Sequence, residues 1–429
     1  MKIRYSIAPL LVVSVLLGVC AINALGQTVV SATITVPPSS VANAADIGLR
    51  AHTSVRYIAP GAISGTPQNY GPPFMGYLYE TPASIACIYG LRPPSAGCNP
   101  NVVTSNPKGG GRAIAIVDAF DDANAYVDLQ TFSAQFGVAP ISPASFQVVY
   151  APAGGAAPGS CSTGPAPQPP SAAFYGWDVE EALDIEYAHA MAPQATLYLV
   201  EAQSNYYTDL YCAVSVASSL VAAAGGGEVS MSWGGGEYPG ETSVDPIFRK
   251  HRVVYFAAAG DGPGVIWPSA SPNVVSVGGT SLSTNFNTGS FESENTWQET
   301  GGGLSLFEPR PDYQDDIAGL VGSQRGIPDI AAVANPYTGV WVLDTLVFGP
   351  GAWYIVGGTS VATPTMAGIV NAAHSFEESS RDELFKMYSS FFGFTDITAG
   401  TCGPYMGSSA APGWDFCSGL GSPRTYFGK

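Results

Sequence analysis

The sequence is poor in charged residues and has very few basic ones. Only 11% of its 429 residues are charged, and 16 Lys and Arg stand against 33 Asp and Glu, so the formal net charge is −17. Such a chain lacks the cationic surface that phosphate backbones require, which argues against a nucleic-acid partner. A low pI also suits a protein that works in acid, because protonation of carboxylates then lowers its net charge.

Long apolar runs are also scarce, and the clearest one is at the N-terminus. Two basic residues precede a mainly apolar stretch over residues 7–21, and Ala24-Leu25-Gly26 then stands before Gln27. We predict an export signal over residues 1–26, after which the protein is secreted without stable membrane insertion. The stretch is short for a span of about 20 residues, although an uncleaved anchor and lipoprotein processing at Cys20 are the alternatives.

No Cys-x-x-Cys pair is present, so the sequence carries no such signature of zinc or redox chemistry. Six cysteines follow the predicted signal, an even number that suggests disulfides in an exported chain. Many pairings are possible, but the short spacings favour Cys87–Cys98 and Cys402–Cys417, which leaves Cys161–Cys212.

The chain divides into a short extension and one main domain. Residues 27–80 are rich in Pro, Ser, Ala and Gly and have little periodicity, so we interpret them as an extended N-terminal segment, either a linker or a remnant propeptide. The main domain is predicted over residues 81–429, a length that provides ample material for a buried core.

The main domain alternates strand and helix patterns. Residues 113–117 form a continuous apolar run, typical of a strand buried on both faces of a parallel sheet. A helix starting at residues 121–122 follows, with Val127, Leu129, Phe132 and Phe136 on its apolar side. Further strands are predicted near residues 146–150, 196–200, 229–233, 253–257 and 274–277, and helices at 178–190 and 209–224. This alternation predicts an α/β fold with a mostly parallel central sheet flanked by helices.

Ser360 lies between the glycine turn Gly357-Gly358 and an apolar helix. In the first turn of a helix, backbone N–H groups and the positive end of the dipole can hold an oxyanion, so Ser360 is a candidate nucleophile. The alternative is an ordinary N-cap. Pro364 is expected in the same first turn, where its missing N–H costs nothing, and Gly368 is expected to let the helix pack closely against a sheet.

A histidine that could activate this serine is missing from its usual place. The chain has only four, His52, His189, His251 and His374. His52 is in the irregular N-terminal segment, His251 is in a basic cluster, and His374 is about 21 Å along the helix from Ser360. His189 is expected on the opposite side of its helix from Glu180. Each is therefore interpreted as an ordinary surface or core histidine.

The predicted helix at 178–190 offers carboxylates instead. Glu180 and Asp184 are spaced i,i+4 and share one face, where each raises the proton affinity of the other and one can act as acid or base. A solvated acidic face near a helix N-terminus is the alternative.

The stretch from Glu180 through Leu183-Asp184-Ile185-Glu186 to Met191-Ala192-Pro193, together with Gly-Gly-Thr-Ser360, resembles the sedolisin family of serine-carboxyl peptidases. These enzymes have a subtilisin-like fold with glutamate in place of the histidine. The resemblance implies that Glu180 is the general base toward Ser360 and that Asp184 orients Glu180 through a shared proton.

Three further positions match the family. In Ala258-Ala259-Gly260-Asp261, the resemblance implies that Asp261 helps to hold the oxyanion, although a turn residue is the alternative. It also implies that Ser232-Trp233-Gly234 pairs with the substrate backbone, with Trp233 near the carboxylates, and that Asp118 extends the carboxylate network. A capping or loop role is the alternative for Asp118.

A calcium site near the C-terminus is also implied by the resemblance. Calcium prefers six or more hard oxygen ligands in flexible geometry. The implied ligands are the side chains of Asp396 and Asp415 and the carbonyl oxygens of Ile397, Ala411 and Gly413. The alternative is two loop aspartates in a loop held by Cys402–Cys417.

These observations favour a secreted, monomeric endopeptidase that cuts protein or peptide substrates in acid through an acyl-enzyme on Ser360. A catalytically inactive binding or surface protein on the same scaffold is one alternative, and an ordinary Ser-His-Asp hydrolase is another. The extension at 27–80 is much shorter than the folded propeptide usual in the family, which leaves assisted folding and autoactivation open.

Overall fold

A computed structural model describes residues 33–59, 72–74, 77–404 and 407–429. The predicted export signal lies outside the described residues. Over the described ranges, the structure contains no helix with both the length and the apolar character needed to cross a membrane.

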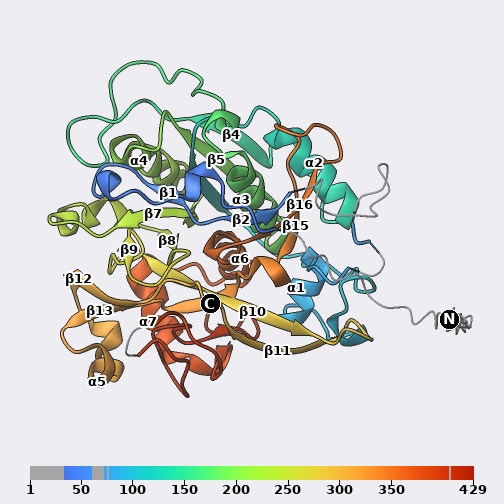
Figure 1. Ribbon diagram of the computed structural model, residues 1–429. Helices are drawn as coiled ribbons and strands as arrows, with labels where there is room; N and C mark the ends of the chain where they lie inside the picture. Colours follow the sequence, from blue (N-terminus) through green and yellow to red (C-terminus); the bar gives the residue numbers. More distant parts are fainter. Residues whose placement is uncertain (1–32, 60–71, 75–76, 405–406) are drawn as a thin grey trace, which may run out of the picture.

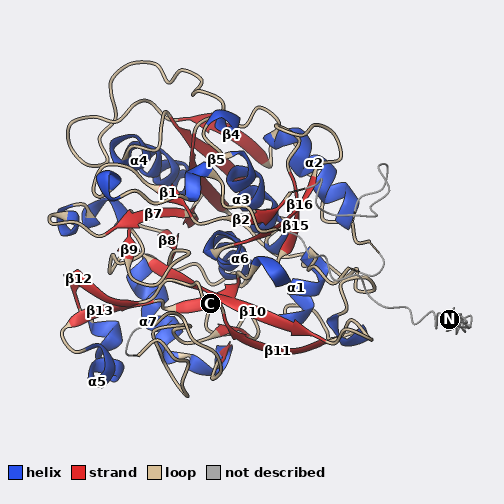
Figure 2. Cartoon of the chain, viewed as in Figure 1, coloured by secondary structure: helices blue, strands red, loops and turns tan. Residues whose placement is uncertain are grey.

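A parallel sheet forms the centre of the molecule (Figures 1 and 2). Its strand order is β11-β10-β8-β6-β3-β5-β4, with β14 also paired to β10, and every pairing is parallel except that of β10 with β11. The strands are β3 (Ala113–Ala119), β4 (Phe146–Tyr150), β5 (Thr196–Ala202), β6 (Gly227–Met231), β8 (Val253–Ala258), β10 (Val275–Thr284), β11 (Phe291–Thr296) and β14 (Ile330–Val333). The predicted α/β class and mostly parallel sheet are confirmed.

Helices cover both faces of this sheet. Alternate residues of β8 enter two different cores: Val254 and Phe256 pack with α3 (Asp178–Met191) and α6 (Thr359–Ala372), while Val253 and Tyr255 pack with α4 (Tyr207–Ala223). This alternation follows from the two-residue period of a strand. The other helices are α1 (Pro82–Ile88), α2 (Ala125–Phe136), α5 (Ala318–Val321) and α7 (Ser380–Ser389).

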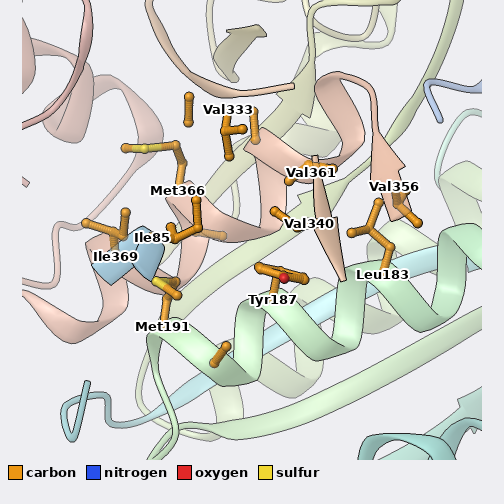
Figure 3. Close-up of a cluster of buried hydrophobic side chains, with 14 of the residues drawn as sticks. Ile85, Leu183, Tyr187, Met191, Val333, Val340, Val356, Val361, Met366 and Ile369 are labelled. Atoms are coloured by element: carbon orange, nitrogen blue, oxygen red, sulfur yellow. The ribbon is translucent and has the colours of Figure 1, made fainter. Parts of the chain in front are cut away.

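The helices α3 and α6 pack directly against each other. Figure 3 shows apolar side chains of the two helices meeting in one cluster, with Leu183, Tyr187 and Met191 from α3 and Val361, Met366 and Ile369 from α6. Gly368 allows the close approach, because a Cβ atom at this position would lie 2.6 Å from the Met191 Cβ. The expectation that Gly368 faces a sheet was wrong, since it faces a helix.

Two local expectations also differ from the structure. The helix α2 begins at Ala125 rather than at residues 121–122, and Val127 on that helix is 58% exposed. Leu129 and Phe132 are buried as expected. Val127 therefore does not belong to the apolar side of α2.

The described part of the N-terminal extension is built into the fold through two short strands. Its strand β1 (His52–Thr53) pairs with β7 (Trp233–Gly236), and β2 (Arg56–Ile58) pairs with β16 (Trp353–Gly357). His52 therefore lies in a strand rather than in an irregular segment. The remaining strands are β9 (Ile266–Trp267), β12 (Gly303–Pro309), β13 (Gln324–Ile327), β15 (Val340–Leu343), β17 (Phe394–Thr395) and β18 (Ser422–Pro423).

Three disulfides link Cys87 to Cys98, Cys161 to Cys212 and Cys402 to Cys417. These are the pairings that the sequence spacings favoured, so the predicted connectivity is confirmed.

Candidate active site

The candidate residues meet where the parallel strands end. Ser360 is in the first turn of α6, Glu180 and Asp184 are on α3, and Asp261 follows β8. Open α/β sheets commonly bind ligands at the carboxyl ends of their strands. Ser360, Glu180 and Asp184 are all 0% exposed.

Ser360 is held by the turn before it and the strand end beside it. Gly358 precedes α6 with a φ of 109°, a conformation that favours glycine. The Ser360 hydroxyl donates a hydrogen bond to the Ser232 carbonyl oxygen (3.2 Å). Pro364 lies inside α6 rather than in its first turn, which corrects the sequence expectation. Because proline has no N–H, it cannot donate to the Ser360 carbonyl oxygen, which lies 3.5 Å from the Ser232 hydroxyl instead.

Glu180 and Asp184 form a buried carboxyl pair. The Ser232 hydroxyl donates to Asp184 Oδ1 (2.8 Å), whereas neither oxygen of Glu180 accepts a hydrogen bond of regular geometry in the described chain. Burial raises the pKa of both carboxyls well above the usual range, and the charges of Asp184 and Asp118 raise the pKa of Glu180 further. The Ser360 hydroxyl opposes part of the rise in the Glu180 pKa, because a nearby hydrogen-bond donor stabilises the ionised carboxylate.

Asp118 lies near the end of β3 and is fully buried. Burial raises its pKa to about 8, and neither of its oxygens has a hydrogen-bond partner among the described residues. Its charge acts on both Glu180 and Asp184. The indole of Trp233 donates to the Val117 carbonyl oxygen (2.7 Å), next to Asp118 in the chain.

Asp261 lies at the N-terminus of the Ser360 helix. Its Oδ1 accepts hydrogen bonds from the Thr359 backbone N–H (2.7 Å) and from the Thr359 hydroxyl (3.0 Å), while its Oδ2 has no hydrogen-bond partner in the described part of the chain. Burial raises the pKa of Asp261 to about 7, opposed by the Thr359 N–H and by Arg56. A neutral Asp261 would therefore have an O–H to donate.

Arg56 is a site residue that sequence analysis missed. Its Nη2 donates to the Asp261 carbonyl oxygen (2.7 Å), and its Nε lies 3.7 Å from Asp261 Oδ2. It also forms an ion pair with Glu299. No sequence signal pointed to Arg56, because it lies in the extension and is brought to Asp261 only by strand β2.

None of the four histidines contacts Ser360 in the described chain. His189 is buried with its Nε2 2.8 Å from the Ala139 carbonyl oxygen, and His52 lies 3.4 Å from Asp46. His251 pairs with Glu378 (2.9 Å), and His374 lies beside Phe376 beyond the end of α6. The structure thus offers carboxyls rather than an imidazole next to the serine.

Glu181 belongs to a second group of carboxyls. It is 0% exposed, and burial together with the charges of Glu201 and Asp122 raises its pKa well above the usual range. A helix turns by about 100° per residue, so Glu180 and Glu181 point to different neighbours. Sequence analysis did not predict that Glu181 would be buried.

The proposed calcium ligands come together in one loop. Asp396 Oδ2 accepts a hydrogen bond from the Gly413 N–H (2.9 Å), and Asp415 Oδ2 accepts one from the Ala411 N–H (2.8 Å). Asp415 Oδ1 accepts from the Cys417 and Ser418 N–H groups (2.8 and 2.9 Å). The carbonyl oxygens of Ile397, Ala411 and Gly413 accept no hydrogen bond within the described ranges. The described residues contain no group of three or more His, Cys, Asp or Glu suited to a metal.

Comparison with known proteins gives three informative similarities, although no family model matches the chain. The chain is 33% identical over 174 residues to sedolisin of Pseudomonas sp. (strain 101), covering 37% of this chain and 28% of the relative. It is 31% identical over 287 residues to kumamolisin of Bacillus sp. (strain MN-32), covering 58% and 50% respectively. It is 29% identical over 187 residues to human (Homo sapiens) tripeptidyl-peptidase 1, covering 37% and 31%. The chain thus spans half or less of the length of these relatives.

A solved structure of Pseudomonas sedolisin superimposes on the described fold. The TM-score is 0.62 at 23% sequence identity, and the match covers 81% of this chain and 95% of the other. This similarity confirms the subtilisin-like arrangement of the sheet and its helices.

Proposed function

We propose that the chain is a serine-carboxyl endopeptidase of the sedolisin family that hydrolyses peptide bonds, because its sequence is similar to those of sedolisin and kumamolisin. The observation that carries this proposal is a buried serine beside a buried carboxyl pair, with no histidine in contact with it among the described residues. In this proposal, Glu180 accepts the proton that an imidazole accepts in ordinary serine hydrolases.

The reaction uses two carboxyls in opposite roles. The Ser360 hydroxyl attacks the substrate carbonyl carbon and passes its proton to Glu180, which later gives it to the leaving amine. The Ser360 N–H and a protonated Asp261 hold the oxyanion. Water then releases the acyl group from Ser360. Asp184 keeps Glu180 oriented through a shared proton, and the Ser232 hydroxyl holds Asp184 (2.8 Å).

Activity in acid follows from these roles. Asp261 must carry a proton to donate to an oxyanion, and its pKa of about 7 keeps it protonated below neutrality. We therefore propose an acidic working range for protein or peptide substrates.

Ser360→Ala and Glu180→Gln test the proposal, with Glu181→Gln as a matched control on the same helix. Release of peptides from acid-denatured casein is expected from the wild type and from Glu181→Gln, and both other variants are expected to lose it. Release from Ser360→Ala or Glu180→Gln would refute the assigned roles. A folded wild type that releases no peptides would favour the inactive binding protein.

Substitution of each histidine addresses the remaining alternative. A folded histidine variant without activity would favour a Ser-His-Asp hydrolase, whereas the proposal expects all four variants to remain active.

We further propose that the 396–397 and 411–415 loops hold a calcium ion. The Asp396 and Asp415 carboxylates and three carbonyl oxygens without hydrogen bonds supply hard oxygens of the kind calcium prefers. Calcium would stabilise these two loops and take no part in the reaction at Ser360. We also propose that the protein is exported from the cell, which its three disulfides support. We propose that it is a monomer.

A further inference from the structure

A pocket with a volume of about 680 Å³ lies beside the loop that follows Asp261. Its wall combines residues 263–265, residues of the strand β12 and residues near the C-terminus, and Figure 1 shows β12 at the left of the molecule. We call it the β12 pocket. The side chains that line it are five apolar ones and one carboxylate: Pro263, Val265, Leu304, Leu306, Phe416 and Glu237. Ligand sites commonly have volumes of about 300–1,000 Å³ and mostly apolar walls.

Glycines keep the β12 pocket open. A Cβ atom on Gly264 would project into open space, and one on Gly303 would lie 3.4 Å from Val265 Cγ2. A Cβ atom on Gly407 would lie 3.3 Å from Phe416 Cδ2. All three glycines line the pocket, so the apolar surfaces of Val265 and Phe416 are left uncovered.

Two exposed leucines form one side of the pocket. Leu304 is 38% exposed and Leu306 is 72% exposed, and both lie on the same face of β12 because strand residues alternate. The carboxylate of Glu237, which follows β7, accepts hydrogen bonds from the Leu306 N–H (3.0 Å) and from the Ser305 hydroxyl. β12 is thereby attached to the end of β7, and the leucines are held in place while their side chains remain in solvent.

The β12 pocket and the candidate active site share one wall. Val265 and Ile266 are neighbours in the chain, and their side chains point to opposite sides of it. Val265 faces Gly303 in the pocket, whereas Ile266 Cδ1 would lie 2.6 Å from a Cβ atom on Gly234 and 3.1 Å from one on Gly260. A single stretch of chain therefore separates the pocket from the inner strand ends.

The pocket is also close to Asp261 along the chain. Pro263 is two residues beyond Asp261, which is at most about 7 Å. The Gly302 N–H donates to the Gly264 carbonyl oxygen (2.8 Å) and fixes this stretch against β12. An extended polypeptide advances about 3.3 Å per residue, so one that has a carbonyl group at Asp261 reaches the pocket within a few residues.

The charges of the pocket restrict its occupant. Glu237 is the one charged residue among the described residues that line it. An anionic group would be repelled there, whereas an apolar side chain would lose contact with water and gain contact with Leu304, Leu306 and Phe416. A polypeptide that reaches Asp261 supplies such side chains on a chain that already passes the pocket.

We propose that the β12 pocket is a second substrate-binding site, which holds an apolar side chain of the polypeptide substrate about two to four residues away from the cleaved bond. This inference rests on the proposed peptidase function, because it assumes that a polypeptide is cleaved at Asp261 and Ser360. Contacts so far from the reacting atoms are the same in the substrate complex and in the transition state, so the pocket lowers KM and leaves kcat unchanged.

Hydrolysis of matched peptides tests the pocket. The substrate is a decapeptide from casein that the wild type cuts at one bond, with leucine or serine placed in turn at each position on either side of that bond. At one of these positions, leucine is expected to lower KM about tenfold relative to serine with kcat unchanged, because a leucine side chain leaves water. In Leu304→Asn and in Leu306→Asn, this ratio is expected to fall to about threefold or less.

Leu320→Asn is the matched control. Leu320 is 56% exposed on α5 and does not line the β12 pocket. The control therefore changes an exposed leucine to the same residue in another place, and it is expected to keep the wild-type preference for leucine.

A binding measurement gives a result that does not depend on catalysis. The full chain with Ser360→Ala is mixed with a blocked heptapeptide of alanine that has one central leucine, or serine in its place. Saturation-transfer NMR is expected to show that the leucine methyl groups contact the protein. This signal is expected to disappear when Leu306→Asn is added to the chain and to remain when Leu320→Asn is added.

The outcomes separate the pocket from the peptidase function. Hydrolysis with equal KM for leucine and serine at every position, or with the wild-type preference in both pocket variants, would overturn the second site and leave the peptidase function standing. Leucine-specific binding to Ser360→Ala without hydrolysis by the wild type would overturn the peptidase function and support the pocket as a site for apolar peptide side chains. A dimer in solution that Leu306→Asn dissociates would show that a second copy covers the pocket, and would overturn the proposal.

Discussion

Glu180 and Asp261 need opposite protonation states at the same pH. Glu180 has to accept the Ser360 proton, for which it must be ionised or share one proton with Asp184. Asp261 has to carry a proton to donate to the oxyanion. Burial raises the pKa of both groups, and for Asp261 the value reaches about 7. Ionisation of Asp261 removes its donor, so activity is expected to fall as the pH rises through neutrality.

Asp261→Asn tests this role because asparagine keeps a donor at every pH. The alkaline limb of kcat/KM is expected to shift upward in the variant, while the maximal rate falls because an amide is a weaker donor than a carboxylic acid. In other enzymes, loss of one oxyanion donor costs roughly 3 to 4 kcal/mol of transition-state stabilisation. The fall in wild-type kcat/KM at alkaline pH is expected to be of that size. A pH profile with a peptide substrate provides the measurement. An unchanged alkaline limb in an active variant would remove Asp261 from this role.

The contact between α3 and α6 holds Glu180 and Ser360 in place, and it depends on a glycine. A Cβ at Gly368 would lie 2.6 Å from the Met191 Cβ and 2.9 Å from the Ala188 carbonyl oxygen. Gly368→Ala is therefore expected to destabilise the fold by roughly 1 to 3 kcal/mol, the usual cost of overpacking. Denaturant unfolding at acidic pH measures the change.

Gly319→Ala is the control for that experiment. Gly319 lies in α5, and a Cβ there meets nothing within 4 Å. Its substitution is expected to leave stability unchanged or raise it by up to about 1 kcal/mol through the loss of backbone freedom. Equal stability of Gly368→Ala and the wild type would show that the two helices can separate without cost.

The C-terminal loop provides a prediction for the metal. A chelator is expected to lower the Tm of the wild type, because an ion that binds only the folded state stabilises it by mass action. Asp396→Ala is expected to remove this sensitivity, since Asp396 is exposed and makes only one hydrogen bond in the described chain, from the Gly413 N–H. The exposed Asp316 supplies the control, and Asp316→Ala is expected to respond like the wild type. Equal chelator sensitivity in all three proteins would reject the site.

Across the whole molecule, many carboxyls are buried without a basic partner. Burial raises the pKa of Glu80 to about 8, of Asp118 to about 8 and of Asp122 to about 7. In the unfolded chain such groups ionise near pH 4. Above that pH the folded state holds more protons than the unfolded state, so the free energy of unfolding falls as the pH rises toward these folded pKa values. Stability is therefore expected to be highest in acid.

Thermal unfolding measures this trend directly. The Tm is expected to fall steadily between about pH 4 and pH 8. Glu80→Gln removes one of the groups involved and is expected to flatten the dependence by up to about 1.4 kcal/mol per pH unit, with the smallest difference from the wild type at pH 4. A Tm that rises from pH 4 to pH 7 would contradict the assignment of neutral buried carboxyls.

The sequence by itself determined the order of strands and helices, the parallel sheet, the disulfide pairing and the shared helix face of Glu180 and Asp184. The order of the elements and the shared helix face depend on contiguous residues, because apolar periodicity and i,i+4 spacing are properties of a short stretch of chain. The disulfide pairing followed from two short cysteine spacings, which left Cys161 to pair with Cys212. The Gly-Gly-Thr-Ser turn before α6 is local in the same sense, and Ser360 indeed lies in the first helical turn.

Only the tertiary structure decided what lies around that serine. The strands β1 and β2 have 2 and 3 residues, too short to show any periodicity, and their partners β7 and β16 are far away in the chain. The position of Arg56 beside Asp261, the burial of Glu181 and the contact of Gly368 with α3 likewise arise between elements distant in sequence. Local secondary-structure propensity does not predict such contacts, because they depend on which surfaces pack together and not on neighbouring residues in the sequence.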